Sequence, residues 1–312
     1  MGEALIDIII DADGDVTSVL GGAALNTARA IARLGVAVEF LGGLSSDSLG
    51  DRIRRSISAD GIGNALSEPV AVPTTLAIAQ IAADGSATYR FLIEGTSVAS
   101  VEPQAAVASI SADSTFLHVG GIALAVEPSA GAAVAVVRES PPSRLVMLDP
   151  NFRPAIAQLS PIFRGAFEAM LTRTDVLKVS TDDLSFLFPD REPLAAATEL
   201  RERFDFAVLL TAGAEDVWIL SAHEAVPCPV PDVKVVDTVG AGDSFSGGFA
   251  AWWTLNGLGR HDLRDVCALT EAVQAGIAVA AMSCSRQGAD PPWREELPTH
   301  WSGRRSTSDP AP

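Results

Sequence analysis

The sequence predicts an α/β fold in which helices flank a mostly parallel central sheet. Apolar runs of strand length alternate along the 312 residues with segments of helical period, separated by glycine and proline. That alternation is typical of successive βαβ units. Residues 75–93 break the pattern, because two β-rich runs there flank Ala83-Asp84-Gly85-Ser86, a sequence typical of a hairpin turn. We therefore expect a small antiparallel β appendage beside the parallel sheet.

The first part of the chain predicts a strand, a helix and a second strand. The run Ala4–Ile10 is rich in isoleucine and has the length of a strand. In the next segment, apolar residues from Leu25 to Ala32 fall on one helical face, and Gly35 is suited to end that helix. The run Val36–Leu41 is then expected to return to the central sheet.

The rest of the chain continues the alternation and ends in helices. Residues from about Ser302 have the composition of a disordered tail. No internal repeat or linker divides the chain, so residues 1–301 are expected to form one domain. Four further strands are expected at Thr115–Val119, Leu145–Asp149, Asp175–Val179 and Phe206–Thr211, and two closing helices at Asp243–Asn256 and His261–Met282.

Charge and composition exclude several classes of partner. The 22 basic and 39 acidic residues give a net charge of −17, which disfavours nucleic acid and anionic membrane surfaces. No Gly-Lys dipeptide occurs, so a Walker A loop is excluded. Three cysteines and four histidines are too widely spaced to indicate a disulfide framework or a zinc site.

Nothing in the sequence indicates a targeting or membrane segment. The first residues are acidic where a signal peptide is basic. The apolar stretch Val266–Met282 contains Glu271 and Gln274 and is short for a membrane span, so we expect a buried helix there. A cytoplasmic protein is the expectation.

The most informative motif is Asp237-Thr238-Val239-Gly240-Ala241-Gly242-Asp243, which leads into an apolar helix. Glycines at 240 and 242 let successive backbone N–H groups point at one spot, next to the positive end of the helix dipole. This predicts an anion-binding loop without lysine. Asp243 beside it is interpreted as a general base that takes a proton from a hydroxyl attacking a phosphoryl group. The alternative is that Asp243 only caps the helix.

This motif resembles the C-terminal signature of the ribokinase-like (PfkB) carbohydrate kinases. The N-terminal signature of that family also has a counterpart, in Gly21-Gly22-Ala23-Ala24-Leu25-Asn26 running on to Arg33-Leu34-Gly35. The resemblance extends from Gly2 to about Leu297. The segment Asp149-Pro150-Asn151-Phe152-Arg153-Pro154 favours the fructokinase-like branch. A ribokinase-like fold is implied, with a β lid formed mainly by residues 70–96 and part of 8–20.

The resemblance also implies roles for particular residues. Asp243 would be the catalytic base, and the backbone of Gly240, Ala241 and Gly242 the anion hole. The other implied positions are Asp7, Gly21, Gly22, Asn26 and Arg153 for the sugar, Ser180, Thr211, Gly213 and Asn151 for the nucleotide, and Asp183 for both the nucleotide and Mg²⁺ through water. Read without the family, Asp7 is equally a turn former, Asn26 a residue of a helix N-terminus and the Asp182-Asp183 pair a solvated helix start.

The function implied is ATP-dependent phosphorylation of a sugar primary hydroxyl, with fructose as the first substrate. Alternatives are 2-keto-3-deoxygluconate, ribose or another small sugar, and a catalytically weak relative that binds sugar or nucleotide for regulation. ATP and Mg²⁺ are implied, while activation by K⁺ and a homodimer are left open. Two departures weaken the substrate prediction: Met1 directly precedes Gly2, which predicts a truncated first strand or a late start, and the stretch 11–21 of the lid is short.

Overall fold

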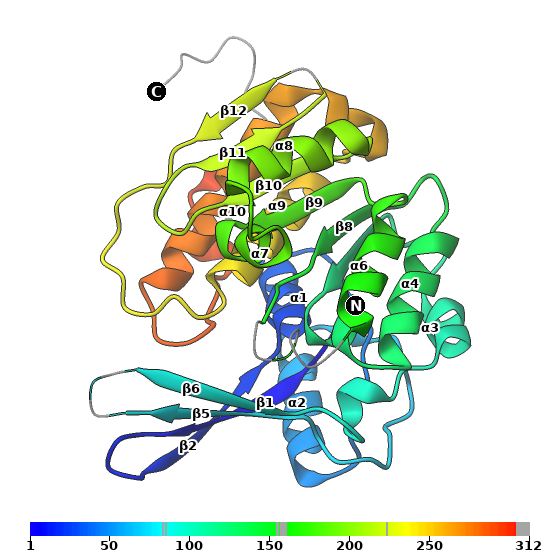
Figure 1. The fold of residues 1–312 in the computed structure, drawn as a ribbon, viewed down its shortest axis with the longest axis vertical. Coiled ribbons are helices and arrows are strands. Elements are labelled where there is room, and N and C mark those ends of the chain that lie inside the picture. The colour runs from blue at the N-terminus through cyan, green and yellow to red at the C-terminus, as the bar shows by residue number, and fades with distance from the viewer. Residues whose placement is uncertain (83, 85, 154–155, 157–160, 223, 304–312) are drawn as a thin grey trace.

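A computed structural model describes residues 1–303 except 83, 85, 154–155, 157–160 and 223. Figure 1 shows two sheets, a larger one covered by helices and a smaller one that extends away from it. The α/β fold with a β appendage is confirmed.

The larger sheet has six strands in the described part of the chain, in the order β12-β11-β10-β9-β8-β7. Its strands β7 to β10 are parallel, and β11 and β12 add an antiparallel edge. All four predicted strands of this sheet form within a residue of their expected limits. The bounds are β7 Phe116–Gly120, β8 Leu145–Asp149, β9 Val176–Ser180, β10 Ala207–Thr211, β11 Val217–Leu220 and β12 Ala225–Cys228.

Helices bury both faces of this sheet, because consecutive strand residues point to opposite sides. Val146 and Leu148 pack into one core, and Leu145 and Met147 into the other. The first core is covered by α3 Pro103–Ser109, α4 Ser129–Glu139, α6 Ile162–Leu171, α7 Thr181–Leu187 and α8 Pro193–Arg203, and the second by α9 Ala241–Leu255 and α10 Val266–Cys284.

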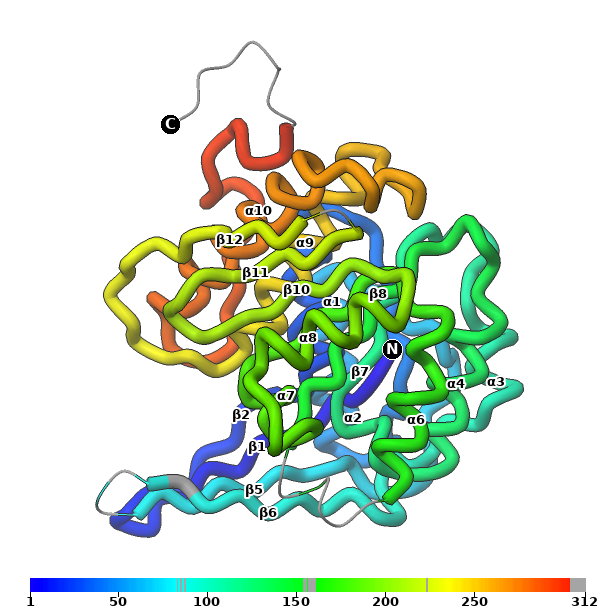
Figure 2. The backbone as a smooth tube through the Cα atoms, turned by 45° about the horizontal axis from the view of Figure 1, so that its top comes forward, coloured from blue at the N-terminus to red at the C-terminus, as the bar shows by residue number. Residues whose placement is uncertain are grey.

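The smaller sheet has the strand order β2-β1-β5-β6 among the described residues, and it projects from the body of the molecule (Figure 2). Strands β5 Leu76–Ile81 and β6 Ala87–Leu92 form the predicted antiparallel pair. Strand β1 Leu5–Ile10 pairs in parallel with β5 and antiparallel with β2 Val16–Gly21. The first strand therefore belongs to this smaller sheet.

Past β7, the described residues extend the larger sheet by a few backbone hydrogen bonds. Met1 N donates to His118 O at 2.5 Å. Gly120 N donates to Met1 O at 3.3 Å, and Gly2 N donates to Leu41 O at 3.1 Å. The strand expected at Val36–Leu41 shortens to β3 Glu39–Phe40, which pairs with β4 Gly63–Asn64. Helices α1 Ala23–Arg33 and α2 Ser48–Ala59 pack around this region in a third core.

The C-terminal helices differ in one respect from expectation. The predicted helix His261–Met282 is divided into a short 3₁₀ helix, η3 Arg260–Arg264, and α10, because the Asp265 side chain caps α10 through Cys267 N and Ala268 N. Helix α10 is long and apolar enough to pass as a membrane span, but it packs against α9 and the sheet, as a buried helix would.

Short 3₁₀ helices complete the described structure. They are η1 Ser97–Ala99, η2 Ile122–Ala125, η4 Arg294–Glu296 and η5 Thr299–Ser302. Ser302, where the tail was expected to begin, is the last residue of η5 and accepts a hydrogen bond from Asn256 Nδ2 at 3.0 Å. The rest of the predicted tail, residues 304–312, lies outside the described residues.

Candidate active site

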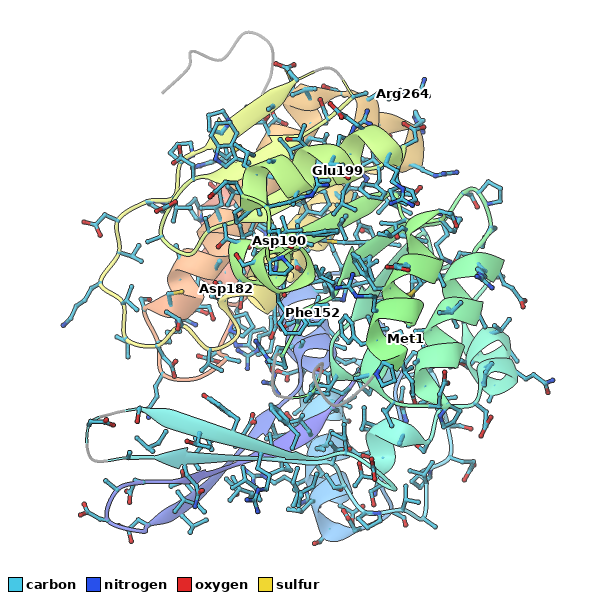
Figure 3. All side chains as sticks on the ribbon, in the orientation of Figure 1. Met1, Phe152, Asp182, Asp190, Glu199 and Arg264 are labelled. Atoms are coloured by element: carbon cyan, nitrogen blue, oxygen red, sulfur yellow. The ribbon has the colours of Figure 1, made fainter. Side chains whose placement is uncertain are left out.

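The sequence-predicted residues gather at the carboxyl edge of the larger sheet. Strands β8, β9 and β10 end there at Asp149, Ser180 and Thr211, and Ser180 lies directly opposite Thr211 in the sheet. The start of α9 lies against the same edge, because Ser246 Oγ donates to Asp149 Oδ2 at 3.2 Å. Figure 3 shows Phe152 and Asp182 from the neighbouring loop and helix near the centre of the molecule. Ligands of open α/β sheets bind at this edge.

Asp243 is buried and held by two side-chain amides. It is the third residue of α9 and is 6% exposed. Asn26 Nδ2 from α1 donates to one carboxylate oxygen at 2.9 Å, and Asn151 Nδ2 donates to the other at 3.1 Å. A residue that only capped a helix would direct its oxygens at the backbone N–H groups of the first turn. Asp243 is instead oriented by groups from two distant segments.

Burial raises the pKa of Asp243 from 3.8 to about 6. The hydrogen bond from Asn26 lowers it, the nearby charge of Asp149 raises it, and the cations Arg153 and Lys178 lower it. A carboxyl group with this pKa is ionised at neutral pH and is basic enough to take a proton from a hydroxyl in a transition state. The site therefore supplies a general base.

The loop before Asp243 has the geometry of an anion-binding turn. Gly240 is in the left-handed region at φ +74°, and a Cβ there would lie 2.5 Å from the Ala289 side chain. Ala241 N donates to Thr238 O at 3.2 Å, whereas the amides of Gly240 and Gly242 have no acceptor among the described residues. Of the three predicted anion-hole amides, those of Gly240 and Gly242 are thus open to a ligand.

The loop itself contains no lysine, as predicted, but a lysine from β9 lies against it. Lys178, in the middle of β9, is 4% exposed, and its Nζ lies 3.0 Å from the position that a Cβ of Gly242 would occupy. Its partner is Asp149 Oδ2, at 3.1 Å. Burial opposes the charge of Lys178, but the carboxylates of Asp149, Asp183 and Asp243 outweigh it, so the pKa of the ammonium group is raised. A fixed positive charge therefore lies directly against the loop.

Asn151 contacts the base and not only the nucleotide side of the site. Its backbone is at φ +44°, a left-handed conformation that is uncommon outside glycine, and its N–H donates to Asp149 Oδ1 at 3.2 Å. This conformation aims the amide at Asp243. Backbone strain of this kind is characteristic of functional sites.

Of the predicted sugar residues, Asn26 contacts Asp243, whereas Asp7 and Gly21 lie in the smaller sheet on β1 and β2. Asp7 Oδ2 lies 2.0 Å from where a Cβ of Gly21 would be, so a side chain at position 21 would displace the Asp7 carboxylate. Gly22, at φ +111°, precedes α1, which carries Asn26. Asn26 Oδ1 is buried and has no hydrogen-bond partner in the described structure, which leaves an acceptor for a bound hydroxyl.

Asp7 and Arg153 are the charged residues of the predicted sugar site. Burial raises the pKa of Asp7 to about 6, while the charge of Arg153 lowers it and that of Glu3 raises it. Arg153 is exposed and affects both Asp7 and Asp243, so its guanidinium lies within electrostatic reach of both carboxylates.

The predicted nucleotide residues lie at the ends of β9 and β10. Thr211 ends β10, and the exposed Gly213 follows at φ +64°. Asp183 is buried in a capping box with Ser180, whose N and Oγ both donate to Asp183 Oδ2 at 2.7 Å. Phe152 N donates to Asp183 Oδ1, also at 2.7 Å. These three donors occupy most of the carboxylate, so Asp183 fits a cation only through an intervening water.

The chain matches the model of the pfkB family of carbohydrate kinases over residues 1–296. It is 31% identical over 254 residues to a fructokinase of Rhizobium leguminosarum bv. trifolii, covering 80% of this chain and 77% of the relative. An aminoimidazole riboside kinase of Salmonella typhimurium is 26% identical over 291 residues, covering 93% and 89%. The crystal structure of a fructokinase with bound ATP from Xylella fastidiosa superimposes with a TM-score of 0.80 at 26% identity over 92% of both chains.

Proposed function

The chain belongs to the pfkB family of carbohydrate kinases and is a sugar kinase, and we propose that it transfers the γ-phosphoryl group of ATP to a primary hydroxyl of fructose, giving fructose 6-phosphate and ADP. The observation that carries the proposal is the buried Asp243 carboxylate, held by Asn26 and Asn151 beside the open amides of Gly240 and Gly242. A base and an anion site next to each other are what phosphoryl transfer to an alcohol requires.

In the proposed reaction, the oxygen of the sugar hydroxyl bonds to the γ-phosphorus while Asp243 takes the proton of that hydroxyl. The bond between that phosphorus and the bridging oxygen of ADP breaks. Charge that develops on the phosphoryl oxygens is stabilised by the Gly240 and Gly242 amides, the positive end of α9 and the Lys178 ammonium. Lys178 is held in place by Asp149, so no side chain has to reorganise during the reaction.

Magnesium would accompany the nucleotide and neutralise phosphate charge. Its only predicted protein contact, Asp183, fits through water, since its oxygens already accept three hydrogen bonds. The described residues include no group of three His, Cys, Asp or Glu side chains that would hold a metal ion directly. This is consistent with a cation held mainly by ATP.

Fructose is proposed because of the fructokinase relatives and the fructokinase-like segment around Asn151. Asp7, Gly21 and Asn26 would bind its hydroxyls under the smaller sheet, which we propose acts as the lid. Aminoimidazole riboside is the second candidate acceptor, because an aminoimidazole riboside kinase matches over nearly the whole chain. The 2-keto-3-deoxygluconate and ribose alternatives rest on the family resemblance alone, as do K⁺ activation and a homodimer. The proposed cytoplasmic location rests on the acidic first residues.

The test is ADP release measured over a panel of acceptors: fructose, 2-keto-3-deoxygluconate, ribose and aminoimidazole riboside. We expect fructose to give the highest kcat/KM. If another acceptor gives a higher kcat/KM, that acceptor replaces fructose in the proposal. If none of the acceptors causes ADP release, the proposed reaction is overturned. Comparing the rates of ADP release in KCl and in NaCl measures the dependence of the activity on K⁺.

Activity is expected to fall on the acid side with a midpoint near pH 6. Asp243 acts only when ionised, and burial raises its pKa to about 6, so the active fraction decreases about tenfold per pH unit below that value. Asp7 titrates in the same range, and its protonation would weaken sugar binding. The slope of log kcat/KM against pH is therefore expected to lie between one and two below pH 6.

The Asp7→Asn variant separates the two titrations. Because asparagine does not ionise, the slope should become one in this variant, with the midpoint of Asp243 kept. A profile of the wild-type protein that stays flat down to pH 4.5 would contradict the ionisation of Asp243 assumed here.

A further inference from the structure

A cavity of about 740 Å³ lies at the opposite edge of the larger sheet from the candidate active site. Its lining residues come from positions just before β8, β9 and β10, from the end of β11 and from the segment that joins α9 to α10. Figure 3 shows Arg264, one of these residues, at the far end of the molecule from Phe152 and Asp182. The residues that the argument uses are Ser143, Asp175, Arg201, Asp205, Arg260 and Arg264.

Arginines are concentrated around this cavity although the chain carries a net charge of −17. Arg201, Arg260 and Arg264 all line it, from the end of α8 and from η3. Two carboxylates, of Asp175 and Asp205, line it too, so the pairing of each arginine decides how much positive charge is available to a ligand.

Asp175 is already fully engaged. It is 2% exposed, and Arg173 Nη1 donates to its Oδ2 at 2.8 Å while Arg260 Nε contacts its Oδ1. Val146 N also donates to Oδ2, at 2.8 Å. Two arginines thus share one carboxylate, and the group as a whole keeps a positive charge. The arrangement holds Arg260 rigidly on the cavity wall.

Arg201 and Arg264 have no carboxylate partner in the described structure. Among the described residues, Arg201 makes one long hydrogen bond of 3.3 Å, from its Nη1 to Phe204 O. Arg264 is exposed and makes no hydrogen bond or ion pair with the described residues. Guanidinium groups that line one cavity and are not paired with a carboxylate are suited to bind phosphate oxygens.

The remaining wall provides contacts for an organic group. Phe206 and Leu263 offer apolar surface, and the Ser143 hydroxyl and the exposed Asp205 carboxylate offer hydrogen-bonding groups. We propose that this cavity binds a small organic phosphate, with the phosphoryl group on Arg201 and Arg264 and the hydroxylated body against Ser143 and Asp205. The proposal is independent of the reaction at the other edge of the sheet.

Isothermal titration with fructose 1,6-bisphosphate tests the proposal on the full-length protein. We expect binding with a Kd below about 1 mM. In the Arg201→Gln/Arg264→Gln double variant, the loss of two charge-assisted contacts should weaken binding by about tenfold or more. Arg260 is left intact because its removal would leave Asp175 with one cation fewer.

A double variant of equal charge change provides the control. Arg138 in α4 and Arg191 after α7 are exposed and do not line the cavity, so Arg138→Gln/Arg191→Gln should bind as the wild-type protein does. Thermal unfolding without ligand checks that each variant is folded. The proposal is overturned if fructose 1,6-bisphosphate does not bind at about 10 mM, which is about ten times the highest Kd expected. It is also overturned if the two double variants bind this ligand equally.

Discussion

Replacing Asp243 with asparagine is expected to lower kcat by about 10²- to 10⁴-fold, the usual contribution of a positioned general base. Under the proposed function, the sugar hydroxyl would then have no group to take its proton, whereas the proposed contacts of the phosphoryl group with Gly240, Gly242 and Lys178 would remain. The KM for ATP should therefore change little. Initial rates of ADP release at saturating substrates measure the effect.

The Asp243→Asn protein should remain folded, which separates loss of chemistry from loss of structure. Burial of the ionised carboxylate raises its pKa, so at neutral pH the charge destabilises the folded state, and the neutral amide removes that penalty. Asn26 can also turn its unpartnered Oδ1 toward the new amide. The exposed Asp182→Asn is the matched control with the same charge change. Equal kcat values for the two variants would contradict the proposal that Asp243 is the base.

Lys178→Met is expected to lower the free energy of unfolding by about 3–5 kcal/mol, the range for breaking a buried ion pair from one side. Asp149 is 2% exposed and would lose its cation, with only Ser246 Oγ and Asn151 N left as donors. Chemical denaturation followed by tryptophan fluorescence measures the change.

A double variant distinguishes the electrostatic explanation from a packing defect. In Lys178→Met/Asp149→Leu the uncompensated Asp149 carboxylate is removed as well, so most of the lost stability should return. Its kcat should nevertheless stay low, because the positive charge beside Gly242 is absent. A double variant less stable than Lys178→Met would contradict the assignment of the loss to an uncompensated Asp149.

The sequence predicted best the strands that are buried on both faces. Leu145–Asp149 was predicted to the residue, because a short apolar run between helical segments has few other structures available. Helix ends were predicted less well where side-chain caps decide them. The predicted helix began at His261, but residues 260–264 form a 3₁₀ helix and the Asp265 cap starts α10 at Val266.

Sheet membership depends on long-range pairing, which the local sequence does not encode. The run Ala4–Ile10 was predicted as a strand and part of residues 8–20 as lid, and the pairing with Leu76–Gln80 places all of β1 in the smaller sheet. The run from Val36 shortens because Val36 N closes on Ile31 O at the end of α1, so the first residues of the expected strand complete the helix turn.

Within the site, the motifs predicted which residues meet but not all their contacts. The position of Lys178 against Gly242 joins β9 to the start of α9, residues 64 apart in the chain, and no local pattern encodes that approach. One signal was available: a lysine in the middle of the apolar run Val176–Val179 must have a buried partner. Asn151 was assigned to the nucleotide, yet its amide reaches Asp243.

The division of the site between two sheets has an evolutionary consequence. Asp243, Lys178 and Asp149 belong to the larger sheet and the helix against it, whereas Asp7 and Gly21 belong to the smaller sheet. Under the proposed function, substitutions in the smaller sheet would change acceptor binding and leave the groups around Asp243 as they are. Acceptor preference would then evolve through one half of the site, and the relatives of this chain include kinases named for fructose and for aminoimidazole riboside.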